Sequence, residues 1–147
     1  MFRSNTIGVP QISATLAPRL QTDRNIMRVL IVDDYPGLIE LYDLALRARG
    51  FEVVGAATAG EAMTLAATEP FDAVVLDFEL PDGSGPELAL RMRSIPALEN
   101  AKFVGMSSYE SGVGKRFDAF LAKPFHPKKL ASVLRKLTAP PKSNVAA

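Results

Sequence analysis

The chain has 147 residues, of which 48% are apolar and 22% are charged, and its formal net charge is +1. This is the balance of an ordinary globular domain, and because the basic residues form no run or stripe it gives no indication of nucleic-acid binding. No apolar run approaches the roughly 18 residues of a membrane span, and a chain without cysteine has no disulfide framework and no cysteine metal cage.

Both ends of the chain differ in composition from its middle. Residues 1–26 hold scattered Pro, Ser, Thr and Asn, show no sustained periodicity and lack the apolar core of a signal peptide. We expect them to form a flexible extension, and Met27 is an alternative start of translation. Residues 139–147 are rich in Pro and polar residues and predict a disordered tail. The folded domain is therefore expected over residues 27–138.

Between these ends, short apolar runs alternate with helical patterns. The apolar runs predict five strands, at 28–32, 51–57, 71–77, 101–106 and 117–122. Apolar residues at helical spacing predict four helices, at 36–50, 58–70, 85–94 and 127–137. Thr58 with Glu61, and Ser84 with Glu87, have the spacing of capping boxes. Alternation of this kind predicts an α/β fold with a parallel sheet covered by helices on both faces.

The connection between the fourth and fifth predicted strands is short. Only 12 residues, "SYESGVGKRFDA", separate Ser107 from Phe120, and a full helix of about 11 residues with two loops does not fit. Gly112 and Gly114 would each cost a helix about 1 kcal/mol. The fourth helix is therefore expected to be short or absent. We hypothesise that this segment becomes ordered on phosphorylation or partner binding, which amide exchange of residues 108–117 would test.

Polar residues lie at the carboxyl ends of four predicted strands. They are Asp33 and Asp34 after the first strand, Asp77 after the third, Ser107 after the fourth and Lys123 after the fifth. Ligands of such sheets bind beyond these ends, so the five side chains are expected to share one crevice. Carboxylates held together need a counter-ion, such as Mg²⁺ or the Lys123 ammonium. A cation, an ammonium and a hydroxyl suit the oxygens of a phosphoryl group, and a carboxylate can accept that group as an acyl phosphate.

In register, the segments "VDDYPG", "LDFELPDGSG", "VGMSS" and "FLAKPF" resemble the receiver domain of two-component response regulators. The resemblance covers about residues 28–137. It implies a flavodoxin-like fold, which is a doubly wound, five-stranded parallel sheet of strand order 2-1-3-4-5.

The resemblance also implies a role for each site residue. Asp77 is the phosphoacceptor, and Ser107 and Lys123 bind the phosphoryl group. Mg²⁺, with Mn²⁺ as an alternative, is held by Asp77, directly by Asp34, largely through water by Asp33, and by the backbone carbonyl of Glu79.

Further roles concern switching and timing. Ser107 and Phe120 are the switch residues, with Phe120 turning inward on activation. The Lys123-Pro124 peptide bond is expected to be cis. Glu79, two residues after the acceptor, and Tyr109, two residues after Ser107, are expected to tune the lifetime of the acyl phosphate.

The function expected from the resemblance is that of a stand-alone receiver. It takes a phosphoryl group from a histidine kinase or histidine phosphotransfer protein, and then changes its affinity for an unidentified protein target or passes the group on. It catalyses its own phosphorylation and dephosphorylation but is not a turnover enzyme. We expect a cytoplasmic protein that is a monomer or a phosphorylation-dependent dimer and does not bind membranes. We also expect no nucleic-acid binding, since the ten residues after Leu137 are too few for a DNA-binding domain.

Other interpretations of the whole chain stay open. One is a phosphorylation-independent binding module that uses residues 107–120 as a fixed interface. Another is an aspartyl-phosphate phosphatase or phosphotransferase, for which Glu79 is suggestive, but a DxD pair and a cap domain are missing. The chain could also be a fragment of a hybrid kinase.

Structural roles compete for single residues too. Asp33 and Asp34 suit the capping of a helix that begins near Pro36, and Phe120 suits an apolar core. His126, the only histidine, could accept a phosphoryl group but is expected to be an ordinary surface residue. Solvated surface positions are expected for Glu69, Asp82, Arg91 and Arg93.

Overall fold

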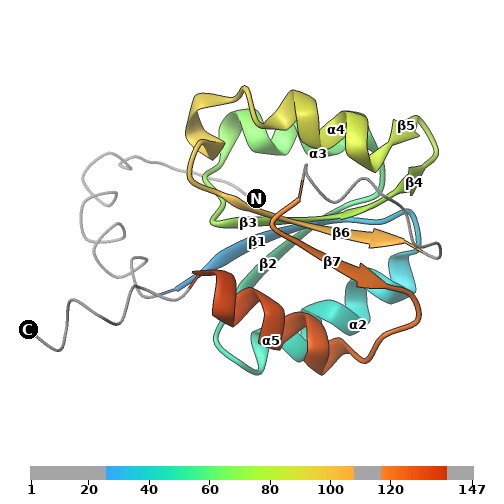
Figure 1. Ribbon diagram of the computed structural model, residues 1–147, viewed down its shortest axis with the longest axis vertical. Coiled ribbons are helices and arrows are strands. Elements are labelled where there is room, and N and C mark those ends of the chain that lie inside the picture. Colours follow the sequence, from blue (N-terminus) through green and yellow to red (C-terminus); the bar gives the residue numbers. More distant parts are fainter. Residues whose placement is uncertain (1–25, 108–116, 139–147) are drawn as a thin grey trace, which may run out of the picture.

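The computed structural model describes residues 26–107 and 117–138 (Figure 1). Residues 1–25 of the predicted extension, the predicted tail and residues 108–116 lie outside these ranges. The described elements, in chain order, are β1 (Arg28–Val32), α2 (Pro36–Arg47), β2 (Glu52–Ala56), α3 (Ala59–Thr68), β3 (Ala73–Asp77), β4 (Glu79–Leu80), β5 (Gly83–Ser84), α4 (Gly85–Met92), a 3₁₀ helix (Pro96–Leu98), β6 (Lys102–Ser107), β7 (Ala119–Ala122) and α5 (Pro127–Thr138).

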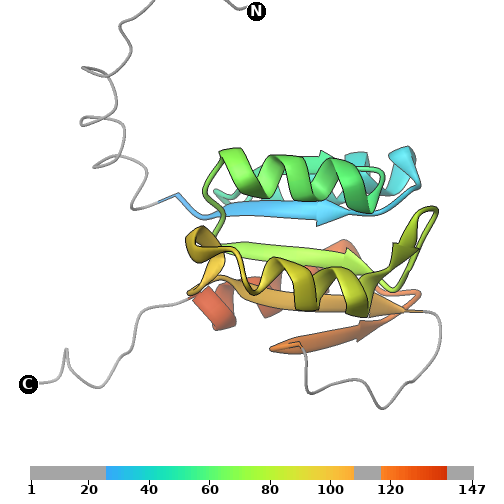
Figure 2. The ribbon, with the colours of Figure 1, turned by 90° about the horizontal axis from the view of Figure 1, so that it is seen from above.

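Five strands form one parallel sheet in the spatial order β2-β1-β3-β6-β7. Counted as the five strands of this sheet alone, the order is 2-1-3-4-5, which confirms the predicted doubly wound, flavodoxin-like fold. All five strands point the same way, so their carboxyl ends meet at one edge (Figure 2). This edge is where the polar residues of the sequence motifs gather.

Helices cover both faces of the sheet, as the continuous apolar strands predict. Figure 1 shows α3 and α4 on one face and α2 and α5 on the other. The residues of β1 alternate between the two cores: Leu30 and Val32 pack with α3 and α4, whereas Val29 and Ile31 pack with α2 and α5. All four of these side chains are completely buried. Each face of the sheet thus has its own apolar core, and the edge between them is left for polar residues.

The local signals for helix starts and stops act largely as predicted. Pro36 occupies the first turn of α2, and Gly50 makes the turn after that helix with a φ of +91°. Thr58 and Ser84 are the N-caps of α3 and α4, and each accepts a hydrogen bond from the backbone three residues on. The predicted helices and strands are therefore present, with ends that differ by a few residues.

Two features of the described chain differ from the predicted elements. The fifth strand of the sheet, β7, begins at Ala119 rather than at residue 117. Just before it, Phe117 is buried and the N–H of Asp118 donates to the carbonyl of Phe103. The loop after β3 forms a two-stranded hairpin, β4–β5, which no periodic pattern indicates. Four α-helices are present among the described residues, and residues 108–116, where the sequence predicts a short or absent fourth helix, lie outside the described ranges. No helix in the described ranges is long and apolar enough to cross a membrane.

Candidate phosphoryl and metal site

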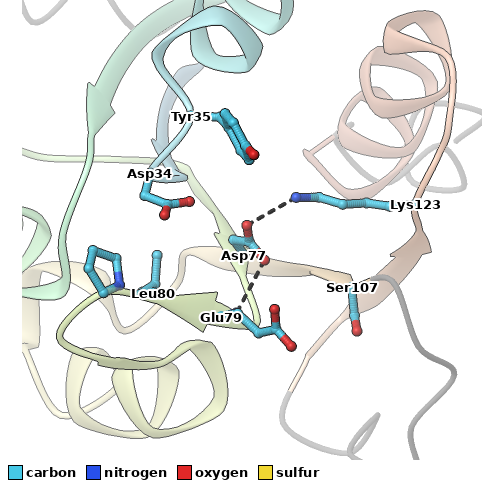
Figure 3. A pocket seen from close by; sticks show the side chains of 8 residues that line it. Asp34, Tyr35, Asp77, Glu79, Leu80, Ser107 and Lys123 are labelled. Atoms are coloured by element: carbon cyan, nitrogen blue, oxygen red, sulfur yellow. Dashed lines mark hydrogen bonds and ion pairs between the residues drawn. The ribbon is translucent and has the colours of Figure 1, made fainter.

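The sheet order brings four strand ends together. β1, β3, β6 and β7 are consecutive neighbours, so the residues that follow or end these strands lie side by side. Their side chains form a cleft of about 300 Å³ lined by Asp34, Tyr35, Asp77, Glu79, Leu80, Pro81, Ser107 and Lys123 (Figure 3). The five polar side chains that the sequence predicts for one crevice are therefore neighbours at this edge, with Asp33 buried directly behind the cleft.

Asp33 is a completely buried carboxylate at the end of β1. Its Oδ1 accepts a hydrogen bond from the backbone of Tyr35 at 3.0 Å, and its Oδ2 accepts one from Lys123 Nζ at 3.3 Å. Burial raises the pKa of Asp33 above its usual value, and the charge of Asp77 adds to this, whereas Tyr35 N–H and Lys123 act in the opposite direction. Burial of Asp33 in the folded protein therefore disfavours its charged form.

Asp77 occupies the centre of the cleft. Its Oδ2 accepts a hydrogen bond from Lys123 Nζ at 3.0 Å, and its Oδ1 accepts one from the backbone of Glu79 at 3.1 Å. Figure 3 shows Lys123 reaching across from the end of β7, with Asp34 on the other side of Asp77. Burial alone would lower the pKa of Lys123, but Asp77 and Asp33 outweigh it and raise that pKa. Lys123 therefore stays a cation beside the carboxylates.

The three carboxylates are close enough to share one metal ion. Oxygens of Asp33, Asp34 and Asp77 all lie within 4.8 Å of one another. Asp34 is exposed to solvent, whereas Asp33 and Asp77 are buried. Oxygen ligands from carboxylates are those that Mg²⁺ prefers, and one lysine does not balance three negative charges. The residues present therefore fit a hard divalent cation.

The remaining predicted residues occupy different places. Ser107, 4% exposed, ends β6 and lines the cleft. Phe120 is half-buried on β7, with its ring centroid 5.5 Å from that of Phe78. The Lys123-Pro124 peptide bond is cis. Tyr109 lies outside the described residues.

The capping interpretation of the acidic pair is wrong, because neither aspartate is the N-cap of α2. The N-cap of α2 is Tyr35, which has no side-chain hydrogen bond of that kind. Asp33 instead accepts the N–H of Tyr35 itself, while Asp34 faces the cleft. His126 has a structural role, because its Nδ1 accepts the N–H of Lys128 at the start of α5.

Of the residues expected at the solvated surface, Asp82 and Arg93 are exposed, as expected, whereas Glu69 is partly buried. Each of these three also has a specific partner. Glu69 forms an ion pair with Arg28 at 2.8 Å. The guanidinium of Arg93 lies 4.3 Å from the centre of the Phe103 ring. Asp82 accepts two backbone hydrogen bonds from α3. Arg91 is exposed, as expected.

Tyr35, Leu80 and Pro81 line the cleft but were not predicted as site residues. Tyr35 is 67% exposed and follows the acidic pair directly. Leu80 and Pro81 belong to the loop after the acceptor. Their positions close to Asp34 and Asp77 in the sequence could have predicted that they line the cleft, since loops at strand ends line the ligand crevice of such sheets.

Comparison with known proteins shows the family to which the chain belongs. The family model described as "Response regulator receiver domain" matches residues 29–135. The chain is 35% identical over 127 residues to the sensor histidine kinase AtsR of Burkholderia thailandensis, covering 82% of this chain and 21% of that protein. It spans about half the length of other curated relatives that it matches.

Solved structures agree with this match. A CheY-like receiver domain from Methylobacillus flagellatus is 29% identical, with a TM-score of 0.71 over 77% of this chain and 99% of that one. TrrA of Thermotoga maritima, solved in complex with Mg²⁺ and BeF, is 30% identical, with a TM-score of 0.68 over 76% of this chain and 98% of that one.

Proposed function

Because the chain belongs to the response regulator receiver domain family, we propose that it accepts a phosphoryl group on Asp77 with Mg²⁺ in the adjoining carboxylate cluster. The observation that carries this proposal is the position of Lys123. Its Nζ lies 3.0 Å from Asp77 Oδ2 and 3.3 Å from Asp33 Oδ2, so a fixed cation stands beside a carboxylate that opens into a cleft. Such an arrangement suits a group that arrives with negative charge.

The proposed transfer takes place at the Asp77 carboxylate. One carboxylate oxygen attacks phosphorus, a P–O bond forms, and the P–N bond to the donor's phosphohistidine breaks with its electron pair going to the imidazole nitrogen. Lys123 and the Ser107 hydroxyl are proposed to bind oxygens of the transferred group. Such transfers depend mainly on positioning and charge stabilisation, which this chain supplies from the rigid ends of its strands.

The proposed ligands of Mg²⁺ are the carboxylates of Asp33, Asp34 and Asp77 and the backbone carbonyl of Glu79, with Asp33 acting largely through water. When bound, the ion offsets the charge of the carboxylates and of the phosphoryl oxygens. The related structure of TrrA, solved in complex with Mg²⁺ and BeF, supports this assignment by analogy. Mn²⁺ is an alternative with similar ligand preferences.

The proposed output is a change in binding to a protein target or a relay of the phosphoryl group. The donor is a histidine kinase or a histidine phosphotransfer protein, and the chain catalyses only its own phosphorylation and dephosphorylation. Ser107 and Phe120 are proposed as switch residues, and Glu79 and Tyr109 as residues that tune the phosphoryl lifetime. A cytoplasmic location and a monomer or phosphorylation-dependent dimer belong to the same proposal.

A direct test uses a small phosphodonor. The protein is incubated with Mg²⁺ and an acyl phosphate, and phosphorylated chains are separated on a phosphate-affinity gel. We expect a shifted band in the wild type and none in Asp77→Asn or after chelation of the metal. Asp72→Asn is the matched control, because Asp72 is an exposed acid away from the cleft, and it should shift like the wild type.

Two outcomes would contradict the proposal. A wild type that never shifts would favour the phosphorylation-independent binding module. A shift that survives in Asp77→Asn would place the acceptor at another residue.

A further inference from the structure

An aspartate outside the carboxylate cluster joins the loop beside the acceptor to a helix on the sheet's flank. Asp82 lies between β4 and β5, and both of its carboxylate oxygens are used. Oδ1 accepts the N–H of Ala59 at 2.7 Å, and Oδ2 accepts the N–H of Gly60 at 3.0 Å. Both donors belong to the first turn of α3, 22 and 23 residues earlier in the chain. These N–H groups lower the pKa of Asp82, so it is a carboxylate at neutral pH.

The helix α3 has a separate N-terminal cap. Thr58 Oγ1 accepts the N–H of Glu61 at 3.0 Å, and Glu61 Oε1 accepts the N–H of Ala57 at 2.8 Å. This is close to a capping box, which satisfies helix-start donors from within the local segment. The helix can therefore begin at Ala59 through its own residues. What Asp82 adds is a connection between the helix and the β4–β5 hairpin.

The hairpin needs such a connection because it is small. β4 and β5 have two residues each, and an isolated hairpin of two strands is marginal in water. Its base is held where the N–H of Gly85 donates to the carbonyl of Phe78 at 2.8 Å. Its tip carries Asp82. Figure 1 shows the hairpin at the carboxyl edge of the sheet, and its two strands form a separate sheet of their own.

The same hairpin forms one wall of the candidate site. The N–H of Glu79 donates to Asp77 Oδ1 at 3.1 Å, and Leu80 and Pro81 line the cleft. The backbone carbonyl of Glu79 is a proposed metal ligand. The position of this wall, and hence of that carbonyl, depends on what holds the hairpin at both of its ends.

We propose that Asp82 is a positioning residue, which fixes the β4–β5 hairpin against α3 and so sets the Glu79 carbonyl and the cleft wall for the metal and the phosphoryl group. This inference rests on the proposed function, because it assigns Asp82 a role at that same site. It also connects α3 to the site, through the backbone N–H groups of Ala59 and Gly60.

The test compares Asp82→Asn with the wild type. Asparagine has the same shape but replaces one acceptor oxygen by an NH₂ donor, which would face an N–H of Ala59 or Gly60. We expect faster amide exchange of residues 79–83 in metal-free protein. We also expect Mg²⁺ affinity, measured by titration calorimetry, to fall roughly threefold to tenfold.

Two controls separate positioning from other effects. Thr58→Ala weakens the cap of the same helix without touching the hairpin, so Mg²⁺ affinity should stay at the wild-type value. Loss of the Asp82 charge could weaken a cation site through space, but about 1 M salt shortens the screening length to roughly 3 Å. A positioning effect should persist at that salt concentration.

The inference is overturned if Asp82→Asn leaves both exchange and affinity unchanged, if Thr58→Ala weakens Mg²⁺ binding equally, or if the difference disappears at high salt. A wild type that binds no Mg²⁺ would instead reject the proposed function. In that case the exchange of residues 79–83 alone decides whether Asp82 fixes the hairpin.

Discussion

Lys123 Nζ lies 3.3 Å from an oxygen of Asp33, a carboxylate with no exposed surface. The same ammonium lies 3.0 Å from Asp77, so one cation serves two buried acids, and an oxygen of a third acid, Asp34, lies within 4.8 Å of theirs. In the absence of metal, the cluster keeps more negative charge than Lys123 can balance. The site is therefore expected to reduce the stability of the metal-free domain.

The first prediction concerns Asp33→Asn in a buffer with a chelator. The pKa of Asp33 is raised above its ordinary 3.8 in the folded protein. A raised carboxyl pKa favours folding below pH 3.8, and this advantage is lost as pH rises through the folded pKa. Asparagine stays neutral throughout. The melting temperature of the mutant should equal that of the wild type near pH 3 and should be roughly 3 to 6 °C higher at pH 7. Circular dichroism measures both values.

A matched control for this substitution is Asp34→Asn, because Asp34 is exposed to solvent whereas Asp33 is buried. Its melting temperature without metal should change much less. Added Mg²⁺ should stabilise the wild type more than Asp33→Asn. A lower melting temperature for Asp33→Asn at pH 7 would mean that the Lys123 ion pair outweighs the cost of burying Asp33.

A second prediction follows from the shared lysine. Lys123→Met removes the partner of Asp33 and Asp77 and leaves two carboxylates facing each other in a buried place. We expect a loss of about 2 to 3 kcal/mol in the free energy of unfolding without metal. In an Asp33→Asn background the loss should be smaller by about 1 kcal/mol or more. Urea denaturation of the four proteins measures this coupling, and additive effects would show that Asp33 and Lys123 do not interact energetically.

The sheet and most of the site could be predicted because their signals are local. The run from Arg28 to Val32 is a continuous apolar strand, and it is β1 with the same bounds. Each polar residue of the cluster follows directly on such a run. The rule that parallel strands share a carboxyl edge then brings Asp34, Asp77 and Lys123 together without any knowledge of their contacts.

The role of Asp82 could not be predicted in this way. It lies in a turn, where an acid usually faces solvent, and its partners are backbone N–H groups 22 and 23 residues away. Backbone donors carry no sequence signature at such a distance. The same holds for Glu69, whose ion pair with Arg28 joins residues 41 apart. The sequence pattern indicates which segments form elements, but not which exposed side chains join them.

A third prediction tests how tightly the acceptor loop is packed. A Cβ on Gly85 would overlap the backbone carbonyl oxygen of Asp77 and lie 2.9 Å from the Cα of Phe78. Backbone atoms of a buried strand end cannot move aside easily, so Gly85→Ala should cost at least about 2 kcal/mol of stability. Gly37→Ala is the control, because no atom lies within 4 Å of its Cβ position and it lies in α2.

The free energy of unfolding of the control, Gly37→Ala, should increase rather than decrease. Alanine in an unstrained helical position stabilises a protein by up to about 1 kcal/mol relative to glycine. Guanidinium denaturation of both variants checks the pair. If Gly85→Ala proved as stable as Gly37→Ala, the loop after Asp77 would adjust freely to the added Cβ.

The last prediction concerns the start of α5. His126 Nδ1 accepts the N–H of Lys128 at 3.1 Å, and α5 has no acidic residue in its first turn. Two lysines there, Lys128 and Lys129, oppose the positive end of the helix dipole, so the helix start depends on this cap. His126→Ala should cost about 1 kcal/mol in guanidinium denaturation, whereas His126→Asp should retain or exceed wild-type stability because aspartate both caps and carries the favourable charge. Ser132→Ala, at an exposed position in the middle of α5, should change stability by less than about 0.5 kcal/mol. If His126→Ala proved as stable as the wild type, the imidazole would contribute nothing to the helix.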